Sequence, residues 1–232
     1  MTGIAPRTDA SPRSRLALRL AWAGLWLLLA VASVEFLVAA YGKYRHLDSA
    51  AYGMFMTRRG WLWLHLAGGL TTVLLGPVQF LTPWRRRSPR LHRLTGRLYL
   101  LGMLVAATGA TGLIATSPAP FAIRAAFSAT ALAWLTTALT GLVAIRHGLV
   151  ERHRRWMVRT YAVTLAPILF RLSLPIALAG GLAPSPTLIA TLLWCSWIVP
   201  LLACEAVRRL AGAWRRTRTS RPAEAMPLSR AR

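Results

Sequence analysis

Long stretches of this 232-residue sequence contain almost no charged residues, although the formal net charge is +23. Lysine is nearly absent too, because all but one of the 29 basic residues are arginine and Lys43 is the exception. The arginines cluster in the two terminal segments and in two short loops, while 55% of all residues are hydrophobic. This alternation excludes an ordinary soluble domain and is typical of a multi-pass membrane protein.

Cysteine is scarce, and the motifs of common soluble enzymes are absent. Cys195 and Cys204 fall in one apolar stretch without a CxxC motif, which argues against a disulfide framework and predicts two small buried side chains. The sequence has no GxSxG, HExxH or phosphate-binding loop, so whether the protein is an enzyme stays open. Nucleic acid is not an expected partner, since the arginines flank apolar spans instead of covering a water-exposed face.

Six apolar stretches remain between the charged segments. Each has about 20 residues or more, enough to cross a ~30 Å hydrocarbon core as a helix, and lipid cannot satisfy the edge of an open strand. We therefore expect an all-α, polytopic membrane helical bundle with six transmembrane helices. The count of six depends most on the fifth stretch, where Pro167, Pro175 and Arg171 leave a broken or re-entrant helix as the alternative. The six stretches are 16–40, 61–82, 97–117, 122–145, 156–180 and 186–207.

The basic residues also predict orientation. Twenty-three of them lie in the N-terminal segment, the loops after the second and fourth stretches, and the C-terminal segment, whereas five lie on the opposite side. The positive-inside rule then places both termini in the cytoplasm. We expect basic cytoplasmic tails at 1–15 and 208–232 around a membrane domain at 16–207, with the tails contacting anionic lipids of the bilayer.

One face of the second predicted helix is small and polar. Its residues recur with helical spacing, so they share one side. Such a face lets another helix or a flat cofactor approach closely, and small-residue helix packing is the competing interpretation. The residues of this face are His65, Gly68, Gly69, Thr72, Gly76 and Gln79.

Four ionisable residues are predicted to lie in the non-cytoplasmic half of the membrane, namely Glu35, His65, Arg124 and Arg171. A charge within lipid costs ~3 kcal/mol or more, so each needs a partner or water. The cluster is interpreted either as a structural Glu35–Arg171 ion pair or as a site for a proton, an anion or a quinone head group.

The third and fifth predicted helices begin alike at the cytoplasmic edge. Each start reads His-Arg and then Arg-x-Tyr, with one residue of difference in spacing. The pattern is either a functional signal or the ordinary preference of arginine and tyrosine for the interface. The two segments run from His92 to Tyr99 and from His153 to Tyr161.

Several blocks follow one another from the second to the fifth predicted helix: His65-x-x-Gly68-Gly69, Leu75-Gly76-Pro77-Val78-Gln79-Phe80, His92-Arg93-x-x-Gly96-Arg97-x-Tyr99, His153-Arg154-Arg155-Trp156-Met157-x-Arg159, and Arg171. Together they resemble a bacterial family of predicted membrane proteins, the domain of unknown function 2306. The resemblance covers roughly residues 16–210. It implies a membrane protein, here expected in the bacterial cytoplasmic membrane, but no established activity.

A looser similarity is to cytochrome b561-type proteins. That resemblance implies a four-helix core that holds two b haems between pairs of histidines. Here His92 and His153 would form the inner pair at the cytoplasmic edge, and His65 would bind an outer haem. The stretch 122–145 contains no histidine to pair with His65, which departs from the pattern. Haem b is thus the candidate cofactor.

Three functions fit these patterns. The histidines favour a membrane redox protein that binds haem b or quinone. The intramembrane cluster and the proline-broken fifth helix favour a small-solute or proton transporter. Glycine-lined faces and the basic tail also suit a non-catalytic membrane assembly component.

Overall fold

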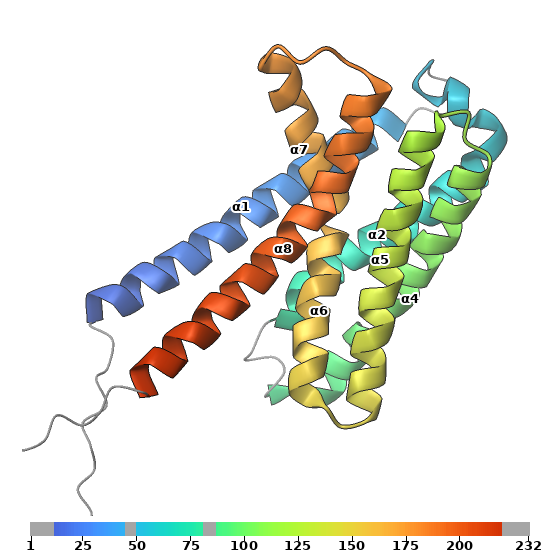
Figure 1. Ribbon diagram of the computed structural model, residues 1–232. Coiled ribbons are helices and arrows are strands. Elements are labelled where there is room, and N and C mark those ends of the chain that lie inside the picture. The colour runs from blue at the N-terminus through green and yellow to red at the C-terminus, as the bar shows by residue number, and fades with distance from the viewer. Residues whose placement is uncertain (1–11, 45–49, 81–86, 220–232) are drawn as a thin grey trace, which may run out of the picture. The chain divides into compact units, whose positions relative to one another are not determined.

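The computed structural model describes residues 12–44, 50–80 and 87–219, and every regular element within them is helical. The all-α class expected from the sequence is therefore confirmed. Parts of both predicted tails lie outside the described residues. The elements are α1 (Pro12–Tyr44), the 3-10 helix η1 (Ala50–Arg58), α2 (Arg59–Phe80), α4 (Pro89–Ala115), α5 (Phe121–Arg146), α6 (Val150–Thr164), α7 (Ala166–Ala179) and α8 (Pro186–Thr219) (Figure 1).

Four described helical segments are long and apolar enough to cross a membrane. The pair α6 and α7 adds a fifth span if the two helices count as one. In the first predicted span, the apolar part of α1 is a shorter segment, Trp26–Gly42. The sixth span and the orientation of the termini therefore stay predictions. The four segments are Phe55–Phe80, Pro89–Ala115, Phe121–Arg146 and Pro186–Ala213.

The fifth predicted span is bent where proline predicts a break. Helices α6 and α7 meet at Leu165 with an angle of 41°. Pro167 has no backbone N–H, so it cannot donate to the carbonyl one turn earlier and the ladder is interrupted. Pro175 lies inside α7 without ending it.

Two glycines close helix ends because only they tolerate the required backbone angle. Gly148 (φ 72°) follows α5, and Gly181 (φ 87°) follows α7. After α5, the N–H of Gly148 donates to Ile145 O at 3.0 Å and that of Leu149 donates to Ala144 O at 2.9 Å. The same pair of bonds recurs after α7. This is the Schellman arrangement, which satisfies the last carbonyls of a helix.

Contacts divide the chain into two compact units, Met1–Thr116 and Ser117–Arg232. In the first unit, α2 packs along α4, and η1 contacts α1 and α2. In the second unit, α5 packs against α6 and α8, and α7 packs against α8. Each unit thus contains a helical hairpin, α2–α4 or α5–α6 (Figure 1).

The packing of α2 against α4 predicts opposite effects of alanine substitution at two adjacent glycines. A Cβ atom on Gly68 would lie 2.3 Å from Gly102 O and 2.4 Å from Ala106 N, whereas a Cβ on Gly69 would meet nothing within 4 Å. We expect Gly68→Ala to lower the free energy of unfolding by about 1–3 kcal/mol through overpacking. Gly69→Ala should leave it unchanged or raise it by up to about 1 kcal/mol, because alanine favours helices.

Thermal unfolding in detergent micelles, followed by circular dichroism, measures both variants. The two substitutions add the same methyl group to neighbouring positions of one helix, so Gly69→Ala is the matched control. Equal stability of the two variants would contradict the close approach of α2 and α4.

Candidate functional site

His65 bridges α2 to α4 through a backbone carbonyl. Its Nδ1 lies 3.0 Å from Ala106 O. A carbonyl oxygen can only accept, so Nδ1 carries the proton in this contact, and Nε2 of the neutral ring keeps its lone pair. The ring is half-buried. The histidine is therefore oriented by α4, with one nitrogen left for another role.

Backbone contact fills the α2–α4 interface beside His65. Besides the approach at Gly68, a Cβ on Gly109 would lie 2.4 Å from His65 N, and the ring of Trp61 occupies the space at Gly112. Two helices this close leave no room between them for a macrocycle. The sequence predicted that either another helix or a flat cofactor approaches the small face of α2. At Gly68 the neighbour observed is helix α4.

The C-terminal end of the same face of α2 is polar, and its hydrogen bonds are satisfied. Gln79 donates from Nε2 to Thr95 Oγ1 at 2.6 Å, and the Thr95 hydroxyl donates to Leu91 O at 2.9 Å. The chain of bonds links α2 to the first turns of α4. Buried polar groups are normally paired in this way, so these two residues are accounted for by packing.

His153 repeats the bonding mode of His65 in the second unit. Its Nδ1 lies 2.8 Å from Gly141 O across the α5–α6 hairpin. The same argument assigns the proton to Nδ1 and a free lone pair to Nε2 of the neutral ring. A Cβ on Gly141 would lie 3.0 Å from Met157 Sδ and 3.3 Å from Trp156 Cβ, so these side chains fill the space beside it.

An arginine–glutamate cluster joins α6 to α8. Arg159 Nη2 lies 2.9 Å from Glu205 Oε2, and the Arg159 guanidinium stacks over Trp156 at 4.8 Å. Glu205 also pairs with Arg208 and Arg209 one turn further along α8. Sequence reasoning missed this cluster. The available signal was an acidic residue in an apolar stretch, three and four residues before two arginines.

Arg58 has a structural role that charge counting did not reveal. It is only 6% exposed and donates from Nη1 to Thr116 O at 3.1 Å and to Leu113 O at 3.4 Å. Its guanidinium lies over the Phe55 ring at 5.1 Å. A cation at the carbonyl end of α4 complements the helix dipole, so Arg58 closes α4.

The predicted intramembrane cluster is distributed over both units. Glu35 lies exposed on α1 and His65 lies on α2, both in the first unit. Arg124 opens α5 and Arg171 lies exposed on α7, both in the second unit. Arg124 Nε is buried without a hydrogen-bond partner among the described residues. The meeting of the four residues therefore stays a prediction.

The inner histidine pair is divided in the same way. His92 lies in the first turn of α4 in the first unit, and His153 lies in the first turn of α6 in the second. Their pairing stays a prediction as well. Tyr99 and Tyr161 of the sequence repeat are 2% and 7% exposed, so both tyrosines are buried.

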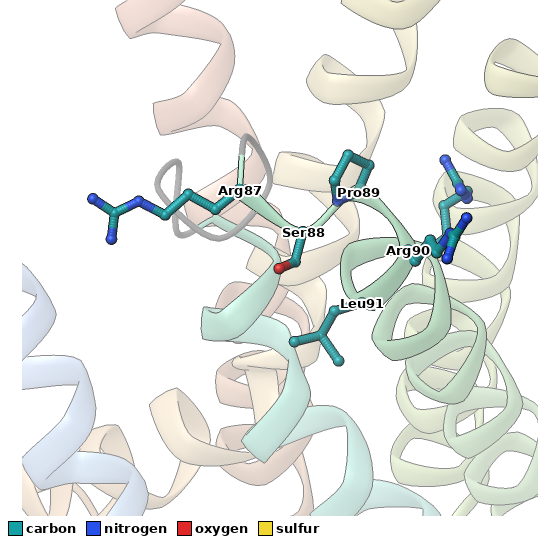
Figure 2. A pocket seen from close by; sticks show the side chains of 6 residues that line it. Arg87, Ser88, Pro89, Arg90 and Leu91 are labelled. Atoms are coloured by element: carbon teal, nitrogen blue, oxygen red, sulfur yellow. The ribbon is translucent and has the colours of Figure 1, made fainter.

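Other candidate sites are weaker. A hollow of about 590 Å³ at the start of α4 is lined by Arg87, Arg90 and Arg93, among others. Figure 2 shows the Arg87 and Arg90 side chains pointing to opposite sides, so these cations do not converge. The described residues contain no group of three or more metal-ligating side chains. Both cysteines are free; Cys195 is exposed, so the expectation that it is buried was wrong.

The comparisons with known proteins identify a family. The family model described as "Predicted membrane protein (DUF2306)" matches residues 62–207, which run from α2 into α8. No curated protein and no solved structure matches the chain significantly. The matched range exceeds half of the sequence and includes both helical hairpins. The chain therefore belongs to the DUF2306 family of predicted membrane proteins.

Proposed function

We propose that the protein is an integral membrane redox protein that binds haem b. The observation that carries this proposal is the Nδ1 contact of His153 with Gly141 O at 2.8 Å. Histidines that ligate a metal usually donate their other ring N–H to a carbonyl or carboxylate, which fixes the tautomer and the ring orientation. Bound haem would supply one-electron chemistry.

The types of residue around His153 suit a haem cofactor. Gly141 orients the imidazole from α5, and Nε2 is the nitrogen that would hold the haem iron. Arg154 follows early in α6, where a guanidinium group suits the carboxylates of haem propionates. His92 would be the second histidine to hold the haem, as the cytochrome b561 resemblance implies.

His65 supports a separate outer site in the same proposal. Its Nδ1 bond to Ala106 O leaves Nε2 free, as in His153. Helix α5 contains no histidine that could pair with it. The outer site is therefore proposed for a quinone head group, with Glu35, Arg124 and Arg171 as the predicted polar neighbours.

An optical spectrum tests the haem proposal directly. Protein purified with haem supplied during expression is expected to show Soret and α-band differences between its reduced and oxidised forms. His153→Ala should lower the bound haem by about tenfold or more, since losing even a supporting contact of a ligand costs 10–100-fold.

His147→Ala is the matched control. His147 is exposed and ends α5, only a short turn from His153, so its removal should leave the spectrum unchanged. A wild-type protein without the two bands would exclude haem b, and equal losses in both variants would exclude His153 as a ligand.

The proposed topology has six spans with both termini in the cytoplasm of a bacterium. The membrane domain is 16–207, and the tails at 1–15 and 208–232 face the anionic lipids of the cytoplasmic leaflet. The support is the excess of arginine at alternate loops, together with α1, which continues through Tyr44.

Cysteine labelling tests this topology. In a background without Cys195 and Cys204, a membrane-impermeant maleimide should label Ser117→Cys and Ser185→Cys in intact spheroplasts. Ser88→Cys should be labelled only after lysis. Labelling of Ser88→Cys alone would reverse the orientation, and protection of Ser185→Cys would mean that α6 and α7 form a re-entrant loop.

Transport is a second candidate, and the bend between α6 and α7 favours it. Helices broken within the membrane line solute paths in many transporters, and Arg171 follows the break at Leu165 on α7. In this case Arg171 would attract an anion or repel a proton as it crosses.

Proteoliposomes test this candidate with protons and chloride. Flux above that of empty liposomes is expected to fall about tenfold with Arg171→Ala, because an ionisable side chain within a membrane-spanning segment marks an ion path. Arg146→Ala, at the exposed end of α5, is the control and should retain flux. Wild-type flux equal to that of empty liposomes would exclude transport of these two ions.

A further inference from the structure

A small hollow between α6 and α8 gathers three arginines. Its volume is about 140 Å³, and it is lined by Arg155, Val158, Arg159, Cys204 and Arg208. A water molecule takes up about 30 Å³ in the liquid, so the hollow admits a tetrahedral anion with a few waters. All of its lining residues belong to the second unit.

Glu205 holds two of these arginines in place. Its Oε2 accepts from Arg159 Nη2 and from Arg208 Nε, each at 2.9 Å. Its Oε1 accepts from Arg208 Nη2 and from Arg209 Nε. A carboxylate has about four acceptor positions, so Glu205 is saturated. The carboxylate therefore connects α6 to α8 and can accept no further hydrogen bonds. We call Glu205 and the three arginines that it binds the α6–α8 bracket.

The bracket leaves N–H donors and positive charge in excess. Arg159 gives one nitrogen to Glu205, and Arg155 gives only Nε, to Glu151 O at 3.2 Å. Within the described residues, the other guanidinium nitrogens of Arg155 and Arg159 have no hydrogen-bond partner. The hollow and its bracket combine four arginines with one carboxylate. Guanidinium groups bind phosphate oxygens with paired, charge-assisted bonds.

Apolar surface continues from the hollow along both helices. Val158 lines the hollow on α6 and is exposed, and Val207, next to the lining residue Arg208, is exposed on α8. These helices belong to segments that can cross a membrane, so their exposed apolar side chains suit acyl chains. A ligand for this place combines a phosphate with hydrocarbon.

We propose that the α6–α8 hollow is a binding site for the phosphate group of an anionic phospholipid. Basic pockets between transmembrane helices bind such head groups. This site lies in the folded helices, apart from the lipid contacts expected of the basic tails. It does not depend on haem, and it takes from the proposed topology only the choice of the cytoplasmic leaflet.

Native mass spectrometry of the full-length protein tests the site. The protein is released from micelles that contain phosphatidylglycerol and phosphatidylcholine in equal amounts, and the ratio of the two bound lipids is measured. The site variant is Arg155→Gln with Arg208→Gln. The control variant is Arg146→Gln with Arg152→Gln, which removes two exposed arginines that do not line the hollow. Both variants lose two charges, and only the first changes the lining of the hollow.

We expect wild-type protein to retain phosphatidylglycerol preferentially. The site variant should lose that preference by about tenfold or more, because it removes two guanidinium groups that can form charge-assisted bonds to the phosphate. The control variant should keep the preference within about threefold, because its two arginines lie outside the hollow. Equal losses in the two variants would overturn the proposal in favour of general surface charge.

A further arm separates a lipid from free phosphate. Inorganic phosphate at millimolar concentration should not displace the bound phosphatidylglycerol. If it does, and if phosphate alone stabilises the wild type but not the site variant, the ligand is the free ion and the lipid assignment is wrong. Thermal unfolding of both variants in micelles confirms that each is folded before lipids are compared.

Discussion

Close contact between helices at small residues is the constraint on which each unit depends. Lipid chains are as apolar as leucine side chains, so helices in a bilayer gain little by hiding apolar surface from one another. Gly68 and Gly102 instead bring the backbones of α2 and α4 into contact, and Gly141 admits Met157 between α5 and α6. The interdigitation supplies the dispersion contacts that hydrophobic burial supplies in water.

Polar bonds between helices add direction to that packing. His65 bonds α2 to α4, and His153 bonds α6 to α5, each through Nδ1 to a backbone carbonyl. Trp134 Nε1 donates to Thr164 Oγ1 at 2.8 Å within the second unit. The histidine bonds fix helix rotation, and in the proposed haem and quinone sites Nε2 is the nitrogen that would meet the ligand. Packing and candidate chemistry thus share the same residues.

The arginines at the charged end of the second unit have different partners. Arg159 and Arg208 are held by Glu205, whereas Arg154 pairs with Glu151 on the solvent-exposed side of α6. All three pairs join arginine to glutamate, but only Arg159–Glu205 connects two helices. An exposed pair within one helix contributes little to stability. The α6–α8 bracket is therefore the one that positions charge.

The sequence by itself determined the helical class and four to five of the six predicted apolar spans, because hydropathy acts locally along the chain. It also marked the fifth span as open to a break at its prolines, since proline lacks a backbone N–H. It also indicated the small face of α2 at Gly68. Only the tertiary structure decided that α4 fills that face, that Gly69 lies beside open space, and that Arg159 meets Glu205. These outcomes depend on the rotation and crossing of neighbouring helices, which residues distant in sequence set together and no local pattern encodes.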